Sequence, residues 1–79
     1  MTIKYDTVAD AVYVSMTQGV VAKTIRVNER LMMDVDAAGN TIGLEILDAS
    51  SQDELVQNIR QNALNGIPVS IETSAPVNA

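Results

Sequence analysis

Apolar and polar residues alternate in five short segments of the first half of this chain. The segments are residues 1–5, 11–16, 24–27, 31–36 and 42–47. A period of two places alternate side chains on opposite faces of an extended strand, so each segment predicts a β-strand. The connections between the segments are short, and short connections favour pairing between neighbours in the chain. We therefore expect a five-stranded antiparallel meander.

The register of this sheet can be predicted from side-chain parity. A slip of one residue would turn all the apolar side chains of a strand toward the wrong face. The pairings that keep these side chains on one face are Tyr5 with Val12, Ile3 with Val14, Val27 with Leu31, Ile25 with Met33, Val35 with Ile42, Met33 with Leu44, and Leu31 with Ile46. This common face is expected to form one side of the hydrophobic core.

A helix is predicted after the strands. Ser51 and Glu54 have the spacing of a capping box, and Asn65, Gly66 and Pro68 give a typical helix stop. The apolar residues between these signals form one stripe at helical spacing, and they are Leu55, Val56, Ile59, Ala63 and Leu64. The expected fold class is α+β, with one C-terminal helix packed on one face of the sheet.

Residues 1–72 are expected to form a single domain. Residues 69–72 alternate again, which predicts either an edge strand or an arm toward a neighbouring subunit. Residues 73–79 are expected to form a polar C-terminal tail.

The residue types that the chain lacks restrict its chemistry. Its 79 residues include no Cys and no His. Disulfides, thiolate nucleophiles, imidazole bases and the ordinary zinc ligands are therefore excluded, and we predict no cofactor. A core of this size supplies about 3–5 kcal/mol of net stability. We expect self-association to a dimer or higher oligomer to supplement it.

The charge balance restricts the partners. Ten acidic residues against five basic ones give a net charge of −5. A chain of this sign repels phosphate backbones, so nucleic-acid binding is not expected, whereas a basic protein partner would be attracted. No apolar run is long enough for a signal peptide or a membrane span. We expect a cytoplasmic protein without membrane contact.

The acidic loop after the fourth segment partly matches a calcium-binding loop. Counted from Asp34, it places Asp36 at position 3, Gly39 at position 6 and Glu45 at position 12, as an EF-hand loop requires. Position 5 is Ala38, which has no side-chain oxygen, and the flanks predict strands instead of helices. A hairpin turn with solvated carboxylates is the favoured interpretation. Asp34, Asp36 and Glu45 are kept as weak metal-ligand candidates.

The first reversal of the chain contains a second polar group. Asp6 and Asp10 bracket the turn, where Asp side chains commonly accept hydrogen bonds from backbone N–H groups. The alternative is a polar pocket in which Tyr5, Asp6 and Asp10 converge, since paired carboxylates can perform acid–base chemistry when their pKa values differ.

A third group lies on the face opposite to the predicted core. Parity places Tyr13, Met32, Asp34, Glu45 and Leu47 on this face. Two carboxylates on one face repel each other unless a cation, a proton or a basic side chain of a partner lies between them. These residues are the candidate binding surface. We expect self-association through this semi-apolar face or through a sheet edge.

Two stretches of the chain resemble a known family. They are the segment from Tyr5 to Val14 and the block Gly43-Leu44-Glu45-Ile46-Leu47-Asp48-Ala49-Ser50, together with the acidic turn between residues 34 and 39. This pattern is similar to a bacterial family of small proteins catalogued as domain of unknown function 2283, from about Ile3 to Ser51. The chain departs from it at residues 28–30, where a Gly is expected.

The resemblance implies a small α+β domain and assigns no catalytic residue. Members of the family resemble companions of other small bacterial proteins, including toxin-like ones, which suggests an antitoxin-type role. Our leading hypothesis is a non-enzymatic interaction module that self-associates and binds a basic protein. The alternative is a small enzyme based on carboxylates or Tyr, or a domain that binds a divalent cation.

Overall fold

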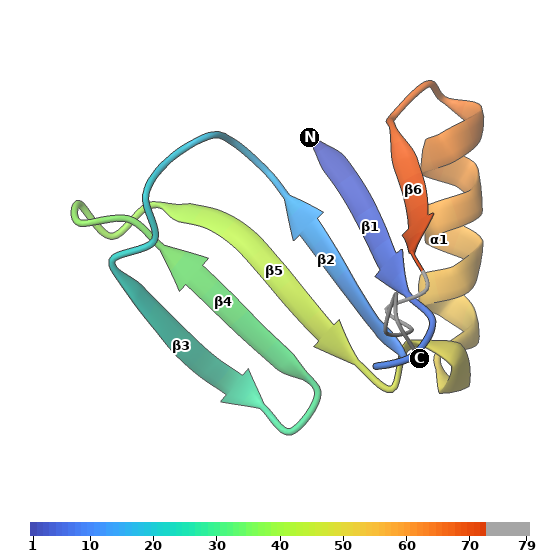
Figure 1. Ribbon diagram of the computed structural model, residues 1–79, viewed down its shortest axis with the longest axis horizontal. Coiled ribbons are helices and arrows are strands. Elements are labelled where there is room, and N and C mark those ends of the chain that lie inside the picture. The colour runs from blue at the N-terminus through green and yellow to red at the C-terminus, as the bar shows by residue number, and fades with distance from the viewer. Residues whose placement is uncertain (73–79) are drawn as a thin grey trace, which may run out of the picture.

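A computed structural model describes residues 1–72 as strands, one 3₁₀ turn and one helix (Figure 1). The predicted polar tail, residues 73–79, lies outside the described residues. The elements are β1 (Thr2–Asp6), β2 (Ala11–Ser15), β3 (Lys23–Asn28), β4 (Leu31–Val35), β5 (Thr41–Leu47), η1 (Ala49–Ser51), α1 (Asp53–Leu64) and β6 (Val69–Glu72). The predicted α+β class is confirmed.

The order of the strands differs from a simple meander. The sheet runs β3-β4-β5-β2-β1-β6, so β2 pairs with β5 and not with β3. Residues 16–22 are too long for a tight hairpin and instead carry the chain across to the far edge. Backbone hydrogen bonds hold both ends of this connection, from Met16 N to the carbonyl of Ile42 and from Ala22 N to the carbonyl of Val35, each at 2.9 Å. The predicted all-antiparallel meander is wrong at this step.

The sheet also has a sixth strand. β6 pairs with β1 in parallel and makes the sheet mixed, so of the two alternatives for residues 69–72 the structure shows the edge strand. Parallel strands require a crossover connection, and α1 supplies it by reversing the chain between β5 and β6. The predicted number of five strands is therefore one too few.

Most of the predicted registers are confirmed. Tyr5 faces Val12, Ile3 faces Val14, Ile25 faces Met33, Met33 faces Leu44, and Leu31 faces Ile46. Two predicted pairings are wrong, that of Val27 with Leu31 and that of Val35 with Ile42. Both lie next to turns, where the register shifts. Leu31 faces Asn28, whose side chain accepts a hydrogen bond from Arg30 N, and Val35 faces Thr41.

The predicted capping box of the helix does not form. Ser51 Oγ donates to the carbonyl of Asp48 at 2.8 Å within η1, and α1 begins at Asp53 without a side-chain cap. The preceding Gln52 donates its side-chain amide to the carbonyl of Leu47. The end of the helix is as predicted, since Gly66 has a φ of 89° just beyond it.

The main core cluster lies at one end of the sheet, and Val35 and Ile42 are buried apart from it on β4 and β5. Ile3, Val12 and Ala49 are buried in the main cluster, with Leu55 and Ile59 of α1 packed against them. The rest of the predicted helical stripe is exposed: Val56, Ala63 and Leu64. The helix packs on one face of the sheet as predicted, but its 12 residues span only part of a six-stranded sheet and leave the rest of that face uncovered.

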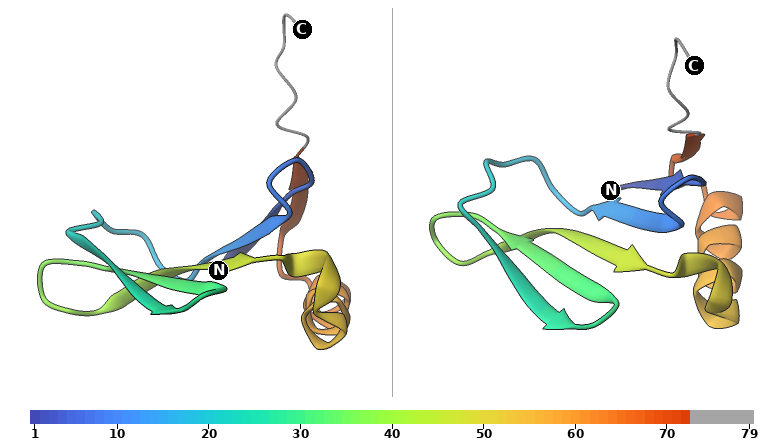
Figure 2. Two further views of the ribbon diagram at one scale, coloured as in Figure 1. Left: turned by 90° about the horizontal axis from the view of Figure 1, so that it is seen from below. Right: turned by 60° about the horizontal axis from the view of Figure 1, so that its bottom comes forward.

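The other end of the same face has no covering element among residues 1–72 (Figure 2). Four apolar side chains of β3, β4 and β5 lie there, and registers with Val14 and Val12 place them on the core side of the sheet. All four are only half-buried, and we call them the uncovered apolar patch: Ile25, Leu31, Met33 and Leu44.

Within residues 1–72, no helix has the length and apolar character needed to cross a membrane.

Candidate functional site

A polar array crosses four strands on the face opposite to the core. The Tyr13 hydroxyl on β2 donates to Asp34 Oδ2 on β4 at 2.7 Å. The Thr24 hydroxyl on β3 donates to Asp34 Oδ1 at 2.6 Å. Each carboxylate oxygen thus accepts a hydroxyl from a different strand. We call these three residues the Tyr13–Asp34–Thr24 array.

The array depends on the absence of a side chain at Gly43. This residue of β5 is buried and lies in register with both Ser15 of β2 and Asp34 of β4. A Cβ atom at this position would overlap the hydroxyl group and the ring of Tyr13. Glycine therefore lets Tyr13 pass directly over the β5 backbone to reach the next strand.

The hydrogen bond to Asp34 strongly perturbs the titration of Tyr13. It is the main cause that raises the pKa of Tyr13 to about 12, with smaller contributions from burial and from the charges of Asp34 and Glu45. The phenol is thus neutral across the physiological range, and it serves as a hydrogen-bond donor instead of a base.

The structure places the remaining residues of the predicted binding surface beside the array. Glu45 is in register with Tyr13, and together with Lys4 and Asp6 they line a shallow hollow of about 230 Å³. Leu47 is half-buried two residues farther along β5, in register with Ala11. Sequence parity anticipated this common face. It did not anticipate Thr24 as the second hydroxyl partner of Asp34.

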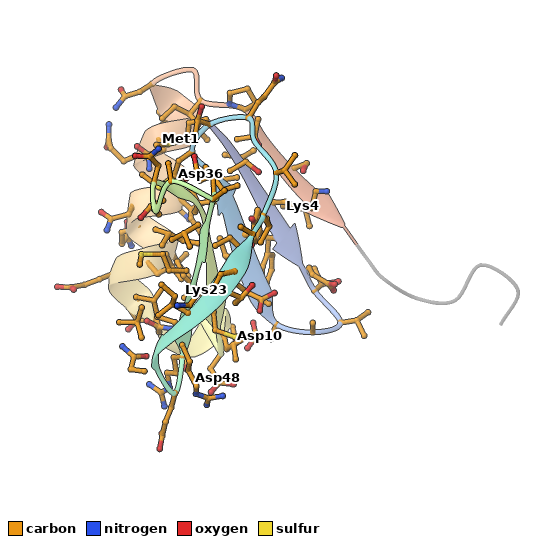
Figure 3. All side chains as sticks on the ribbon, turned by 90° about the vertical axis from the view of Figure 1, so that its left-hand side faces the viewer. Met1, Lys4, Asp10, Lys23, Asp36 and Asp48 are labelled. Carbon is orange, nitrogen blue, oxygen red and sulfur yellow. The ribbon has the colours of Figure 1, made fainter. Side chains whose placement is uncertain are left out.

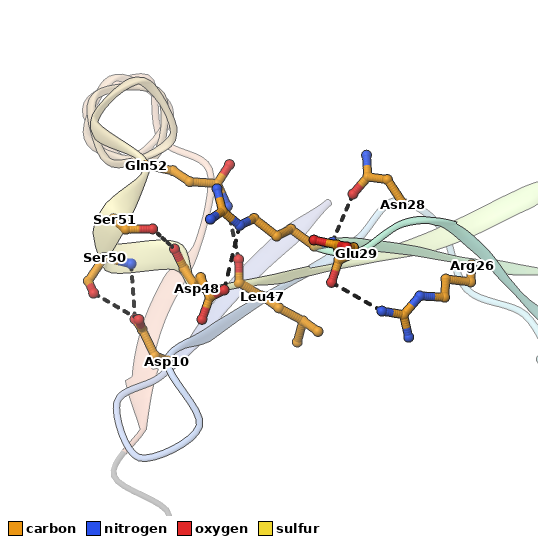
Figure 4. Close-up of polar contacts among 10 residues, drawn as sticks. Asp10, Arg26, Asn28, Glu29, Leu47, Asp48, Ser50, Ser51 and Gln52 are labelled. Carbon is orange, nitrogen blue, oxygen red and sulfur yellow. Dashed lines mark hydrogen bonds and ion pairs between the residues drawn. The ribbon is translucent and has the colours of Figure 1, made fainter.

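A second polar group joins the first hairpin to the start of the helical region (Figure 4). Asp10 has a φ of 52° at the end of the first turn, and its Oδ1 accepts the Tyr5 hydroxyl at 2.8 Å. Ser50 donates its backbone N–H to Asp10 Oδ1 at 3.0 Å and its hydroxyl to Oδ2 at 2.8 Å. The Asp10 carbonyl also accepts Ala49 N at 3.0 Å. This Tyr5–Asp10–Ser50 lock fixes η1 to the hairpin.

The predicted polar pocket is therefore only partly assembled. Tyr5 and Asp10 meet, but Asp6 Oδ1 accepts hydrogen bonds from Val8 N and Ala9 N inside the turn. The pKa of Asp10 is lowered, first by the Ser50 hydroxyl and then by Tyr5, while the same hydrogen bond raises the pKa of Tyr5. Both groups titrate farther from neutral pH than usual, which is the opposite of what acid–base catalysis requires.

The acidic loop has the geometry of a turn. Asp36 Oδ1 accepts Ala38 N and Asn40 N, and these bonds, led by that from Asn40, lower the pKa of Asp36. Asp36 lies at the opposite end of the sheet from Asp10 and Asp48 (Figure 3). Among residues 1–72 no group of three or more acidic side chains could hold a metal ion.

Comparison with known proteins identifies the family. A protein-family model described as "Protein of unknown function (DUF2283)" matches residues 2–50. The chain belongs to this family. A search of curated proteins and a search of solved structures each find no match.

The DUF2283 match includes every residue of both polar groups. It runs from the start of β1 into η1, so it contains the Tyr13–Asp34–Thr24 array, Gly43 and the Tyr5–Asp10–Ser50 lock. The helix α1 and strand β6 of this DUF2283 protein lie beyond the matched residues.

Replacement of Asp34 by Asn is expected to lower the pKa of Tyr13 from about 12 toward the ordinary value of 10.0, because the hydrogen bond from the Tyr13 hydroxyl to a carboxylate is lost, together with the smaller effect of the Asp34 charge. In the intact protein the folded-state pKa exceeds the unfolded value. The stability that the neutral Tyr13 hydroxyl contributes through its hydrogen bond to Asp34 is therefore complete below pH 10, and it is lost as the pH rises through about 12. Phenolate absorbance during alkaline titration measures this directly, since the chain has two Tyr and no Trp. Asp36→Asn is the control, and an equal effect there would contradict the assignment.

Gly43→Ala is expected to destabilise the protein by about 1–3 kcal/mol, because the new Cβ displaces the Tyr13 ring. In a Tyr13→Ala background this loss of stability should largely vanish, since the free-energy effects of substitutions at two contacting residues are not additive. Denaturant unfolding of the four proteins in this cycle measures both effects. Gly19→Ala, whose Cβ would lie 3.4 Å from Ile42, is the control for a merely tight contact.

Ser50→Ala is expected to weaken the acid sensitivity of folding. The folded-state pKa of Asp10 lies below its ordinary value of 3.8, so its stabilisation is present above that pH and is lost as the pH falls through the folded-state value. Unfolding free energies of wild type and Ser50→Ala should therefore converge as the solution is acidified. Ser51→Ala provides the matched control, because Ser51 donates to a backbone carbonyl. A difference for Ser50→Ala that does not change with pH would contradict this account.

Proposed function

We propose that this protein is a non-enzymatic interaction module that forms a homodimer through the uncovered apolar patch and binds a basic protein on its polar face. The observation that carries the proposal is the incomplete cover of the sheet. The helix buries one end of the core-side face, and the patch of Ile25, Leu31, Met33 and Leu44 remains half-exposed.

An apolar sheet face is stable in water when another layer buries it. Among residues 1–72 only six apolar residues are buried, which is a small core for a sheet of six strands. A second copy of the chain would supply the missing layer for the patch. The same layer would cover Val27 of β3, which is 51% exposed.

The shape of the molecule suits a twofold arrangement. Two sheets that pack face to face lie about 10 Å apart, and a helix with its side chains is about 10–12 Å wide. The patches of two copies could therefore meet while the helix of each copy lies beside the partner's sheet. A twofold interface needs one self-complementary surface, and an apolar patch satisfies this condition.

The opposite face supports the second part of the proposal. The sequence predicts self-association through this face, which carries Tyr13, Met32 and Leu47, or through a sheet edge. In the folded chain this face also holds Asp34 and Glu45, which give it acidic groups suited to a basic partner. We therefore assign dimerisation to the patch and a basic, toxin-like protein to the polar face.

The titration behaviour of the candidate groups favours a binding role over the enzymatic alternative. Tyr13 has a pKa raised to about 12, the pKa of Tyr5 is raised as well, and that of Asp10 is lowered. A general acid or base works best with a pKa near the working pH. These shifts move the pKa values of all three groups away from neutral pH.

Two neighbouring methionines allow a matched test of the dimer. Met33 belongs to the patch and Met32 to the opposite face, and both are half-buried on β4. We expect a dimer in wild type and Met32→Glu. Met33→Glu should weaken dimerisation by about a hundredfold, because a charge would be buried without a partner. Analytical ultracentrifugation over a concentration series measures the dissociation constant, with circular dichroism as the folding control.

Two results would reject the assignment. A wild-type protein that stays monomeric at high concentration would exclude the dimer. A dimer disrupted by Met32→Glu and not by Met33→Glu would place the interface on the polar face instead.

A further inference from the structure

A groove of about 310 Å³ lies between α1, β6 and the end of β1. Its walls are mainly apolar, with Val56 and Ile59 from the helix and Val69 and Ile71 from the strand. The floor includes Val12, which is fully buried. The groove shares no residue with the uncovered apolar patch. Its volume is within the range of small-molecule sites, about 300–1,000 Å³.

One cationic side chain lines this apolar space. Arg60 lies on α1, four residues beyond Val56 in the direction away from η1. Within the part of the chain that the structure describes, its guanidinium forms no salt bridge or hydrogen bond. A guanidinium matches the geometry of a carboxylate, to which it can donate two parallel hydrogen bonds.

The opposite end of the groove has a different character. Tyr5 and Ser50 line it there, and both donate their hydroxyl groups to Asp10. Because Asp10 carries a negative charge, an anionic group is disfavoured at this end and favoured at Arg60. The groove therefore has a polarity, with a site for an anion at one end and apolar walls that lead toward η1.

We propose that this groove binds a free medium-chain monocarboxylate, with the carboxylate at Arg60 and the alkyl chain along Val56, Ile59 and Ile71. Ile71 is 70% exposed and Val56 is 41% exposed, so an alkyl chain would bury apolar surface that the protein leaves in water. The inference does not rest on the dimer, because the groove shares no residue with the uncovered apolar patch.

The first experiment uses sodium decanoate as the probe, below its micelle-forming concentration. Amide chemical shifts of the ¹⁵N-labelled protein should change at Tyr5, Val56, Ile59 and Ile71, and should saturate. Decanol and decyltrimethylammonium have the same chain without the negative charge, and we expect both to bind about tenfold more weakly. Equal binding of all three compounds would overturn the proposal, and so would shifts centred on Met33 and Leu44.

Two pairs of variants test the two ends of the ligand. Arg60→Gln should weaken decanoate binding about three- to tenfold and leave decanol unchanged, since only the charged contact is removed. Arg30→Gln removes a cation that pairs with Asp48 outside the groove, so it controls for net charge. A similar loss of decanoate affinity in both variants would show that only the net charge of the protein matters, and it would reject the site at Arg60.

Val56→Trp should abolish decanoate binding by filling the groove. Val56 is partly exposed, so the larger ring can be accommodated without unfolding, which the thermal transition checks. Gln57→Trp is the matched control at an exposed position outside the groove, and it should bind normally. Unchanged affinity of a folded Val56→Trp protein would exclude this groove as the binding site.

Discussion

The pairing of β2 with β5 is the constraint on which the rest of this fold depends. It joins the hairpin of β1 and β2 to the three strands β3, β4 and β5, which are continuous in the chain. It brings Tyr13 within one strand of Asp34, and it places Ile46 opposite the buried Val12. The polar array on one face and the core on the other therefore both follow from a single strand contact.

The local features of the fold could be predicted from the sequence, because they depend on neighbouring residues. Alternation located five strands, parity gave the pairing of Ile3 with Val14, and Gly66 marked the end of the helix. The strand order could not be obtained in this way. Alternation defines the face of a side chain, but it does not say which edge a strand meets after a long connection such as residues 16–22.

The candidate sites likewise combine features that the sequence could predict with contacts that it could not. Parity placed Tyr13 and Asp34 on one face, but their contact requires β5 to lie between β2 and β4, with glycine at position 43. The different hydrogen-bond partners of Asp6 and Asp10 depend on the turn, where Asp6 accepts hydrogen bonds from the backbone and Asp10 has a positive φ. Ser50 joins Asp10 from 40 residues away, and such a contact leaves no local pattern.

The parallel pairing of β1 with β6 has a consequence for the order of folding. Ile3 pairs with Val69, so the first strand gains its outer neighbour only when nearly the whole described chain is in place. The adjacent strands β3, β4 and β5 close short loops and can form early, whereas closing a long loop costs more entropy and slows folding. The hairpin of β1 and β2 and the strands β3, β4 and β5 can therefore form before α1 and β6 complete the cover of Val12.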